Sequence, residues 1–550
     1  MMMKNKIKIN GRKTNHWVLG LLAMVVIGDV LMAAATDIGS RRELFVDDAL
    51  IERLEGGAEL RLHHPVPQEI VLEHDEPWEG TGSGYHSVFQ DGDLYRMYYK
   101  SWNISPFAEA KPGESEVHPR LCAYAESDDG IHWRKPSLGL HEFQGSTDNN
   151  IVLVQEKMGE LELDAAHPAV FLDTNPNAPA DARYKAIIRQ MVHPDTTLIA
   201  LKSPDGIHWS LLHDEPIITD GKFDSQNLAF WDEVAGCYRA YWRYFIPDED
   251  DYWMGSRAIR TATSKDFIHW ENQADLTYED SPLEQLYTNV VKPYHRAPHL
   301  LLGFPARYLE RGHEDKTAEE RAELGELEDP ERVAQWSASM LALPELDARQ
   351  SRGHASERYG AALTDTLLMA SRNGVSFKRW NEAFLSPGME RPGTWHYGQQ
   401  YMAWHVVETK SALLGAPNEL SLYAVESYWT APGSALRRYT LRLDGFVSLR
   451  APSSGGELVT TPIRFEGSQL ALNFATSAAG SVRVEIQDES GQPLPGFTLS
   501  DCAPLYGNTI ERAVTWTAGR RLAALVGRTV RLRFVLQDAD VYAYQFKPVR

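Results

Sequence analysis

The sequence is poor in cysteine. Only Cys122, Cys237 and Cys502 occur among 550 residues, so at most one disulfide can form and the fold must depend on core burial. No cysteine–histidine spacing of the kind that binds zinc is present. The acidic run at 248–251 leaves calcium binding as an alternative, but a solvated loop is the commoner use of such a run. The sequence therefore predicts neither a metal nor another cofactor.

Basic residues are in the minority. Lysine and arginine total 55 against 76 aspartates and glutamates, which gives a formal charge of −21. This balance argues against nucleic acid or an anionic membrane surface as the partner. The 15 tryptophans, 23 tyrosines and 18 phenylalanines suit a β-protein core, and they also suit stacking on sugars. The partner that we predict is a carbohydrate substrate.

Long apolar runs are missing, apart from one near the N-terminus. Five lysine and arginine residues precede the apolar run 17–28, and Ala33–Ala35 offers small residues for cleavage. This pattern predicts a signal peptide over residues 1–35 and a secreted or periplasmic mature protein that has no membrane span. Asp29 interrupts the apolar stretch, so an uncleaved anchor is the alternative.

One turn motif recurs along the chain. The segment Ser127–Trp133 returns as Ser203–Trp209, as Ser264–Trp270 and, in altered form, as Ser371–Phe377. Each copy follows a short apolar segment, and most contain Asp-Gly or Asn-Gly, which supplies the positive φ of a hairpin turn. Regular turns between short strands predict a radial β-array such as a propeller. We predict that these turns are structural and not catalytic.

Two further strands precede each turn, so each unit has the four strands of a propeller blade. A fifth unit without the turn motif spans 400–449. The sequence thus predicts an all-β fold: a five-bladed β-propeller over 36–452, with an insertion in blade four at 308–360 that is helical in pattern at 317–327 and 330–343. Alternation of apolar and polar residues predicts a C-terminal β-sandwich over 457–550 as an accessory domain.

Three acidic residues occupy one position in successive units. Asp164, Asp224 and Glu284 each lie six residues before the paired apolar positions of the inner strand, and Glu79 is the nearest acid in the first unit. Carboxylates from neighbouring blades would converge at one end of the central channel. Glycosidic bond cleavage uses one protonated and one ionised carboxyl group. Purely structural carboxylates at strand ends are the alternative.

Basic residues close the second strand of the same units. Lys100, Arg189 and Arg243 do so in register, and Arg307 does so more loosely. Such side chains can fix the carboxylates by ion pairing, or they can bind an acidic or sulfated sugar or a phosphate. The pattern leaves both roles open, and ion pairing is the simpler of the two.

The predicted substrate-binding set contains Glu79, Arg189, Arg243, Arg307 and six further residues. Histidines on inner strands and amides beside Asp224 can bond sugar hydroxyls, and aromatic rings can stack on sugars. Core packing is the competing explanation for the histidines and the aromatic rings. The six are His86, His167, Gln226, Asn227, Tyr287 and Trp395.

Several motifs resemble those of five-bladed propeller glycoside hydrolases. They are the segments 91–99 (DGDLYRMYY), 173–177 (DTNPN) and 183–186 (RYKA), together with the Ser-x-Asp-Gly-x-x-Trp turns. The chain is most similar to proteins described as like the N-terminal domain of glycosyl hydrolase family 32, a family related to family 43. A C-terminal β-sandwich is also similar to the family 32 arrangement. The resemblance implies a glycosidase, and it specifies the fold better than the substrate.

The catalytic motifs of family 32 are nevertheless absent, and Trp78-Glu79-Gly80 stands where the first of them is expected. Fructosidase specificity is therefore not implied. The family 43 arrangement, carried over by position alone, implies Glu284 as general acid, Asp224 as base or nucleophile, and Asp164 as the modulator of their pKa values.

We accordingly predict a secreted glycoside hydrolase. One alternative is a glycoside phosphorylase that holds phosphate with Arg189, Arg243 and Arg307. A second is a propeller that binds carbohydrate without catalysis. A sialidase with Tyr287 as nucleophile is a further alternative, because sialidases carry a related turn repeat.

Overall fold

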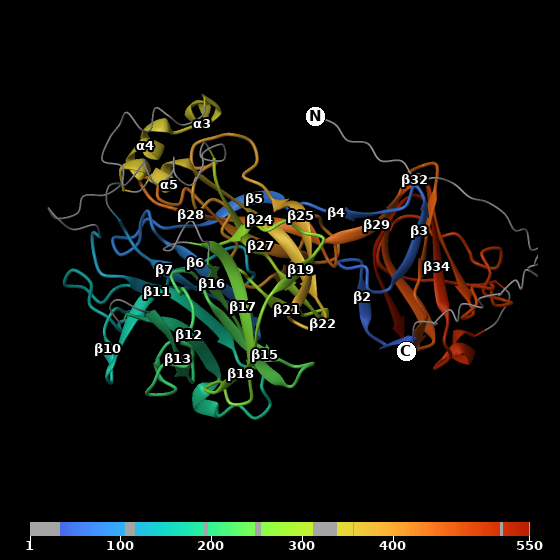
Figure 1. Ribbon diagram of the computed structural model, residues 1–550, viewed down its shortest axis with the longest axis horizontal. Coiled ribbons are helices and arrows are strands. Elements are labelled where there is room, and N and C mark those ends of the chain that lie inside the picture. The colour runs from blue at the N-terminus through green and yellow to red at the C-terminus, as the bar shows by residue number, and fades with distance from the viewer. Residues whose placement is uncertain are drawn as a thin grey trace, which may run out of the picture.

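The computed structural model describes residues 34–104, 116–191, 196–247, 255–311, 338–355, 357–517 and 521–548. All but two residues of the predicted signal peptide lie outside the described residues, as do the acidic run 248–251 and the predicted helix 317–327. The described chain forms two lobes (Figure 1). The larger is a ring of sheets, and the smaller contains the C-terminal strands together with the first strands of the chain.

Four sheets of the larger lobe are unbranched and antiparallel, and each has four or five strands. Their strands are β6 (Gly84–Asp91), β7 (Leu94–Ser101), β8 (Leu121–Ser127) and β9 (Ile151–Val154); β10 (Lys157–Met158), β11 (Leu161–Leu172), β12 (Tyr184–Met191), β13 (Thr196–Ser203) and β14 (Ser210–Leu211); β15 (Leu228–Asp232), β16 (Cys237–Ile246), β17 (Ser256–Ser264) and β18 (Trp270–Asp275); and β26 (Val407–Thr409), β27 (Glu419–Glu426), β28 (Ala435–Arg442) and β5 (Val66–Glu73).

A further sheet of the ring is branched. In it, β20 pairs with β23, and β21 pairs with β22, while β22 and β23 both pair with β24. The first strand position of this sheet is therefore divided into β20 and β21, and the second into β22 and β23. This arrangement confirms the predicted β-propeller. The count of five blades stays a prediction, because it depends on counting the branched sheet as one blade. Its strands are β19 (Thr277–Glu279), β20 (Gln285–Leu286), β21 (Lys292–Tyr294), β22 (Ala297–Gly303), β23 (Ala306–Glu310), β24 (Ala362–Ser371) and β25 (Ser376–Leu385).

The ring is closed by the N-terminal strand β5, which pairs antiparallel with β28 from near the end of the propeller. Tyrosines on the second strands add links between neighbouring sheets. Tyr98 donates to the carbonyl oxygen of Gly206 (2.9 Å), Tyr241 to that of Gly374 (2.9 Å) and Tyr423 to that of Gly130. Each acceptor lies in one of the repeated turns, so the turns join one sheet to the next.

The repeated turns have one internal hydrogen-bond pattern. In the second copy, Ser203 accepts from the backbone N–H of Gly206, and Asp205 accepts from the N–H groups of Ile207 and His208. Gly206 has φ near +82°, and a Cβ there would collide with the hydroxyl of Tyr98. The other copies repeat these bonds. The turns are therefore structural, as predicted.

Short helices from the predicted insertion lie beside the ring (Figure 1). Arg352 of α4 donates to the carbonyl oxygen of Trp429 (2.8 Å), which fixes this helix against the last propeller sheet. Residues 312–337 of the insertion lie outside the described residues. The helices are α3 (Ala338–Ala342), α4 (Leu346–Ala355) and α5 (Glu357–Ala361), and short 3₁₀ turns lie at Ala180–Ala182 and Leu522–Leu525.

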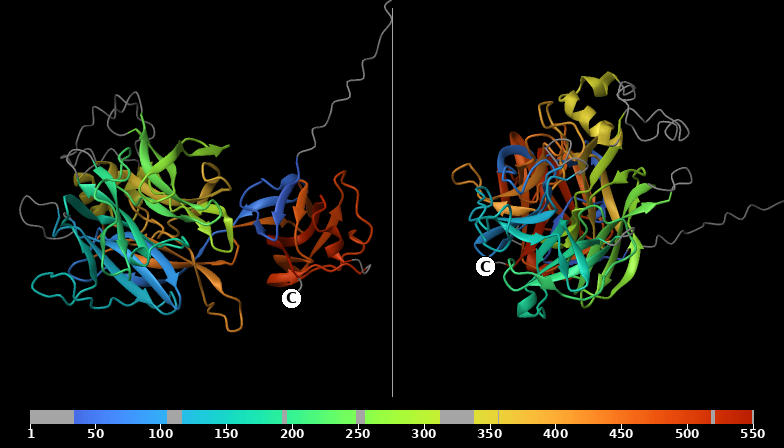
Figure 2. Two further views of the ribbon diagram at one scale, coloured as in Figure 1. Left: turned by 90° about the horizontal axis from the view of Figure 1, so that it is seen from below. Right: turned by 90° about the vertical axis from the view of Figure 1, so that its left-hand side faces the viewer.

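The smaller lobe is the predicted β-sandwich, but it begins earlier in the chain than predicted. Strands β2, β3 and β4 pair with β34, β30 and β29, so residues 36–62 belong to this lobe and not to the propeller. Figure 2 shows these N-terminal strands against the C-terminal ones. Its strands are β1 (Thr36–Gly39), β2 (Arg42–Leu44), β3 (Ile51–Gly56), β4 (Glu59–Leu62), β29 (Val447–Ala451), β30 (Gly456–Thr460), β31 (Ile463–Phe465), β32 (Gln469–Gln487), β33 (Asn508–Ala513) and β34 (Arg531–Lys547).

The two lobes share one apolar core, which extends from Phe230 and Trp404 in the ring to Phe534 in the sandwich. Burial of this surface is the main stabilising contribution. The three cysteines are buried and unpaired, so no disulfide supports the fold. Among the described helices, none combines the length and the apolar character that a bilayer crossing requires.

Candidate active site

Asp164 is a fully buried carboxylate on β11. Its strand partner across the sheet is Arg189 on β12, whose guanidinium binds the Asp164 carboxylate directly. Arg120 adds a second ion pair at 3.3 Å. Burial works to raise the pKa of Asp164, but His167 and the two arginines outweigh it and hold that pKa well below its usual range. Asp164 therefore stays ionised and holds Arg189 in place.

Asp224 is placed differently, because its side chain is 65% exposed. It lies in the loop before β15, and its Oδ1 accepts a hydrogen bond from Nη1 of Arg189 (3.0 Å). Enclosure by protein works to raise the pKa of Asp224, but His167, Arg189, Arg243 and Lys100 lower it below its usual range. Asp224 is thus in contact with water and is also surrounded by protein, so we infer that it lies in a recess of the surface. We call Asp224, these four side chains, Asp164 and Arg120 the Asp224 recess.

His167 lies between the two carboxylates. Its Nδ1 is 3.7 Å from Asp164 and its Nε2 is 3.5 Å from Asp224. The pairing of β11 with β12 shifts register between Asp164 and Ala169, and such an irregularity turns side chains away from the regular alternation. Burial lowers the pKa of His167 to about 4, with Arg189 acting in the same direction. The imidazole is therefore neutral near pH 7.

Aromatic rings form the walls around the recess. Burial raises the pKa of Tyr85 and of Tyr428, and the negative charge of Asp224 adds to both shifts. Tyr401 stacks on Tyr85 with the ring centres 5.9 Å apart. Tyr287 stacks on Tyr401 at 5.4 Å. Tyr85 and Tyr428 lie more than 300 residues apart in the sequence. All four rings are only 2–6% exposed, so they form a packed wall beside Asp224 and leave no open face for a sugar ring.

The loop that carries Asp224 is held by its own amides. Asn227 donates to the carbonyl oxygens of Phe223 (3.1 Å) and Ser225 (2.8 Å), which lie on either side of Asp224. Gln226 donates to the carbonyl oxygens of Tyr85 and Pro168 in neighbouring sheets. Both amides are 2% exposed. The sequence predicted contacts with substrate, whereas the structure uses both residues to position Asp224.

Glu284 belongs to a separate group of charges in the branched sheet. Its Oε1 accepts from Arg307 (3.1 Å), and its Oε2 pairs with Arg379 (2.8 Å). Arg307 also binds Asp365. Within the described part of the chain, none of these four residues forms an ion pair with a member of the Asp224 recess. The structure thus joins two of the three predicted carboxylates through Arg189, while the ion pairs of Glu284 are with other residues.

Two other predicted residues are buried in the first sheet of the ring. Glu79 is 1% exposed; it pairs with Lys135 (2.6 Å) and accepts a hydrogen bond from Tyr99. His86 is fully buried, and its Nε2 lies 3.1 Å from Nε2 of His74. Burial raises the pKa of Glu79 and lowers that of His86. These contacts favour a structural role over substrate binding, because each oxygen of Glu79 has a partner and His86 is paired with His74.

The two predicted stacking residues also differ in place. Tyr287 lies in the aromatic wall, only 6% exposed, with its hydroxyl 3.1 Å from that of Tyr397. Trp395 packs against Met340 and Leu363 near the insertion helices and donates to the carbonyl oxygen of Gly388. Trp395 therefore lies outside the Asp224 recess.

Sequence reasoning missed part of the site. Arg120, which supports Asp164, follows the segment 105–115 outside the described residues and belongs to no repeated position. Tyr401 and Tyr428 lie in the fifth unit, where the lack of the turn motif left no register to align them. Among the described residues, no group of three or more histidine, cysteine, aspartate and glutamate side chains is arranged to hold a metal ion.

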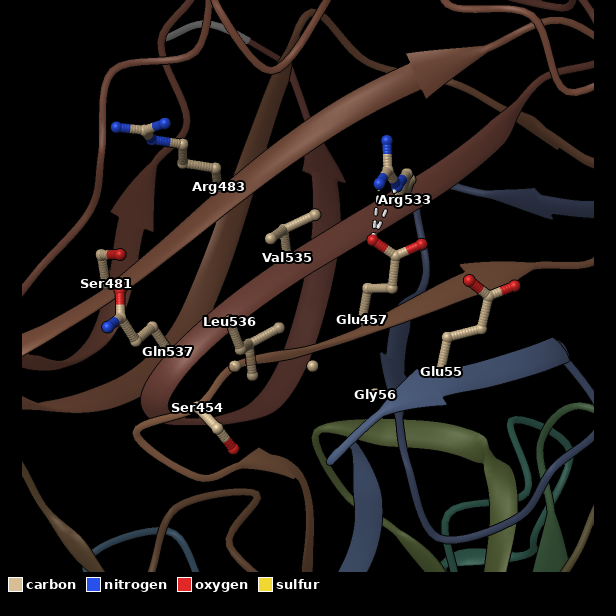
Figure 3. Close-up of a pocket in the computed structure, with 12 residues that line it drawn as sticks. Glu55, Gly56, Ser454, Glu457, Ser481, Arg483, Arg533, Val535, Leu536 and Gln537 are labelled. Atoms are coloured by element: carbon tan, nitrogen blue, oxygen red, sulfur yellow. Dashed lines mark hydrogen bonds and ion pairs between the residues drawn. The ribbon is translucent and has the colours of Figure 1, made fainter.

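The sandwich has a hollow of its own, shown in Figure 3. Arg533 pairs there with Glu457 (2.6 Å), while Arg483 points away from both. Its lining residues include no aromatic ring, and its two carboxylates are already paired, Glu457 with Arg533 and Glu55 with Arg53. The Asp224 recess, which has an exposed carboxylate among cations, is therefore the stronger candidate.

No family model matches the sequence, and a search of curated proteins finds no significant relative. Solved structures that are similar in fold include a thermostable family-43 glycoside hydrolase (11% identity, TM-score 0.40, covering 68% of this chain and 95% of that one). An N-acetylgalactosamine deacetylase from F. plautii matches at 11% identity and a TM-score of 0.40, with 69% and 94% covered. A fructofuranosidase from Schwanniomyces occidentalis matches at 12% identity and a TM-score of 0.35, with 87% and 98% covered. At these values the likeness carries no argument about activity, and the function has to be argued from the site.

Proposed function

We propose that this protein is a secreted glycoside hydrolase that cleaves glycosidic bonds of poly- or oligosaccharides, with Asp224 as the reacting carboxylate. The observation that carries the proposal is the contrast between the exposed Asp224 and the fully buried Asp164, which share Arg189. Asp224 is ionised and open to solvent, so it can attack an anomeric carbon or activate a water molecule.

In this proposal Asp164 does not react. It fixes Arg189, and Arg189 with His167 orients the carboxylate of Asp224. A side chain whose position is fixed before the substrate arrives loses little entropy in the reaction. Asp164 is thus a positioning residue, which replaces the predicted role of tuning a catalytic acid.

Hydrolysis also needs a proton donor to the leaving oxygen. Glu284, the predicted acid, has both oxygens bound by arginines and forms no ion pair with the recess among the described residues. The two carboxylates of the recess are held ionised by cations. This observation favours a second candidate function, a propeller that binds carbohydrate without cleaving it.

The phosphorylase alternative receives less support. It requires Arg189, Arg243 and Arg307 to hold phosphate, but Arg189 binds two aspartates and Arg307 binds Asp365 and Glu284. Only Arg243 is without a carboxylate partner within ion-pair distance among the described residues. A phosphate would have to displace existing ion pairs to meet all three arginines.

A pair of substitutions tests the proposal. Asp224→Asn should lower kcat/KM for oligosaccharide hydrolysis by at least about 10³-fold, because it removes the nucleophile or base. Glu284→Gln should change it less than about threefold, because Glu284 lies in another charge group. Release of reducing sugar from a panel of oligosaccharides is the measurement, and Asp128→Asn, on an exposed turn, is the matched control.

The outcomes separate the candidates. Loss of activity in Asp224→Asn with retention in Glu284→Gln supports the proposal. Sugar binding by the wild-type protein without any product supports the binding propeller and contradicts hydrolysis. Loss in Glu284→Gln on natural sugars, with activity kept on aryl glycosides that need no acid, would restore the predicted acid and contradict the separation of the two charge groups.

A further inference from the structure

The four basic residues that close the second strands divide into two kinds in the structure. Arg189 and Arg307 each bind two carboxylates. Lys100 and Arg243 have no carboxylate within ion-pair distance among the described residues, although both are at least 95% buried. Ion pairing therefore explains the first two residues and leaves the second two without a carboxylate partner in the described part of the chain.

Lys100 is enclosed by aromatic rings. Its ammonium lies 4.7 Å from the ring centres of Tyr85 and Trp102 and 5.0 Å from that of Tyr428. It donates one hydrogen bond, to the hydroxyl of Tyr428 (2.7 Å). An ammonium has three N–H donors, so two remain for another group. A buried cation of this kind is unfavourable for folding alone.

Arg243 is the second of these cations, and its charge also acts on Asp224. Its guanidinium packs on the ring of Tyr287 at 4.9 Å, and its Nε donates to the carbonyl oxygen of Lys222 (2.9 Å). Its remaining donors interact with the hydroxyl of Tyr287 and bind no carboxylate within ion-pair distance among the described residues. A planar guanidinium fork of this kind matches the two oxygens of a carboxylate or of a sulfate.

We propose that the Asp224 recess recognises an acidic sugar, whose carboxylate or sulfate group is bound by Lys100 and Arg243. The inference rests on the proposed function, because it names the class of sugar on which Asp224 acts. The recess holds four cations, Lys100, Arg120, Arg189 and Arg243, against the two aspartates, and Arg120 is also bound to Glu116. An anionic group would complete this charge balance and would use the remaining donors of Lys100, whereas a neutral sugar would not complete it.

Protonation of Lys100 should make the recognition depend on pH. Burial lowers the pKa of Lys100 to about 7, and Asp224 and Asp164 oppose this shift while Arg120 and Arg189 add to it. An anion favours the charged ammonium, so affinity should fall as the pH rises through 7. The charged and titratable groups around Lys100 are Asp224, Asp164, Arg120, Arg189, His74, His86, Tyr85 and Tyr428.

Calorimetric titration of the full chain tests the proposal with matched sugars: galacturonic acid and galactose 6-sulfate against galactose, and glucuronic acid against glucose. At pH 6, at least one acidic sugar should bind about tenfold or more tightly than its neutral partner, since a charge-assisted hydrogen bond contributes that much. The preference should fall severalfold between pH 6 and pH 9. The two acidic galactose derivatives distinguish a carboxylate from a sulfate.

Variants locate the group. Arg243→Met and Lys100→Met should each reduce the preference about tenfold, Arg243→Lys should retain part of it, and Lys100→Met should lose the pH dependence. Lys292→Met is the matched control, because Lys292 also has a pKa lowered to about 7 and an aromatic surround, but its charged neighbours are Asp173 and Glu233. It should keep the preference unchanged.

Several results would overturn the inference. They are equal affinity for acidic and neutral sugars, no binding of either, a preference that survives both Arg243→Met and Lys100→Met, and binding of inorganic phosphate alone. Hydrolysis assays on the same sugars keep the two proposals apart. Preferential binding without cleavage contradicts the hydrolase and supports the acidic-sugar site. Cleavage of neutral sugars without a preference for acidic ones supports the hydrolase and contradicts the acidic-sugar site.

Discussion

The Asp224 recess and the Glu284 group arise from the same positions of neighbouring repeat units, yet they differ in exposure and in charge. In the recess, Asp224 is 65% exposed and cations outnumber carboxylates. In the other group, two carboxylates face Arg307 and Arg379, and Glu284 is 17% exposed. Equivalent sequence positions therefore supply the same kinds of residue. The neighbouring side chains decide whether those residues are open to a substrate or are neutralised by one another.

The largest expected difference between the two groups is in stability. Arg189→Met leaves Asp164 as a fully buried carboxylate with only Arg120 and His167 nearby, and should lower the free energy of unfolding by about 3–5 kcal/mol. Arg307→Met leaves Glu284 with Arg379, and should cost about 1–2 kcal/mol. Urea unfolding measures both. Equal losses would show that the two groups are not distinct, and Asp164→Asn combined with Arg189→Met should recover part of the loss.

The burial of Lys100 in the recess predicts a dependence of stability on pH. Burial lowers the pKa of Lys100 in the folded protein to about 7, from an ordinary value of 10.5. Between these values the unfolded chain binds more protons, so the Lys100 contribution to stability rises with pH. Lys100→Met should therefore be more stabilising at pH 6 than at pH 9, by about 2–3 kcal/mol. Thermal unfolding at both pH values checks this, and an identical effect at both would contradict a buried ammonium.

The loop that exposes Asp224 gives a smaller effect. Asn227→Ala removes two hydrogen bonds to the backbone around Asp224, and should cost about 1–2 kcal/mol of stability. It should also lower hydrolysis about tenfold through kcat, because a displaced carboxylate reacts more slowly. Steady-state kinetics and urea unfolding are the measurements. Unchanged kcat with lowered stability would mean that the loop position does not matter for the reaction.

The smallest expected effect lies outside both charge groups. Ser203→Ala in the second repeated turn removes the acceptor of the Gly206 N–H, and should lower the free energy of unfolding by about 1 kcal/mol. Activity should stay at the wild-type level, because the turn is structural. The substitution Ser101→Ala provides a comparison outside the turns, because Ser101 lies on a strand and donates to the carbonyl oxygen of Trp78. A drop in activity without a drop in stability would contradict the structural assignment.

Much of the fold was predictable because the relevant signals are local. The Ser-x-Asp-Gly turns carry their own hydrogen-bond acceptors and positive φ residue, so each copy forms a hairpin without help from distant segments. The alternation of Val482, Val484 and Ile486 with polar residues places these three in the sandwich core, although Glu485 between them is buried as well. The pairing of residues 36–62 with the C-terminal strands joins distant parts of the chain, and no local pattern predicts such pairing.

The candidate site was predictable in part for the same reason. The repeat register placed Asp164, Asp224, Arg189 and Arg243 at equivalent positions, and the structure brings all four together. The same register also selected Glu284. In its sheet the first two strand positions are divided into short strands, so Glu284 has different neighbours. Register specifies a position on a strand. It does not specify what the next sheet places opposite that position.

The sequence by itself determined the turns, the strand alternation and the supply of acidic and basic residues at matching places, because these depend on interactions within a few residues. Only the tertiary structure decided that Asp224 faces water, that Asp164 is enclosed with Arg189, and that Lys100 and Arg243 have no carboxylate partner among the residues that the structure describes. These properties depend on burial and on charges contributed by different sheets. Solvent exposure and electrostatic balance are set by the whole ring, so no single segment of the chain contains them.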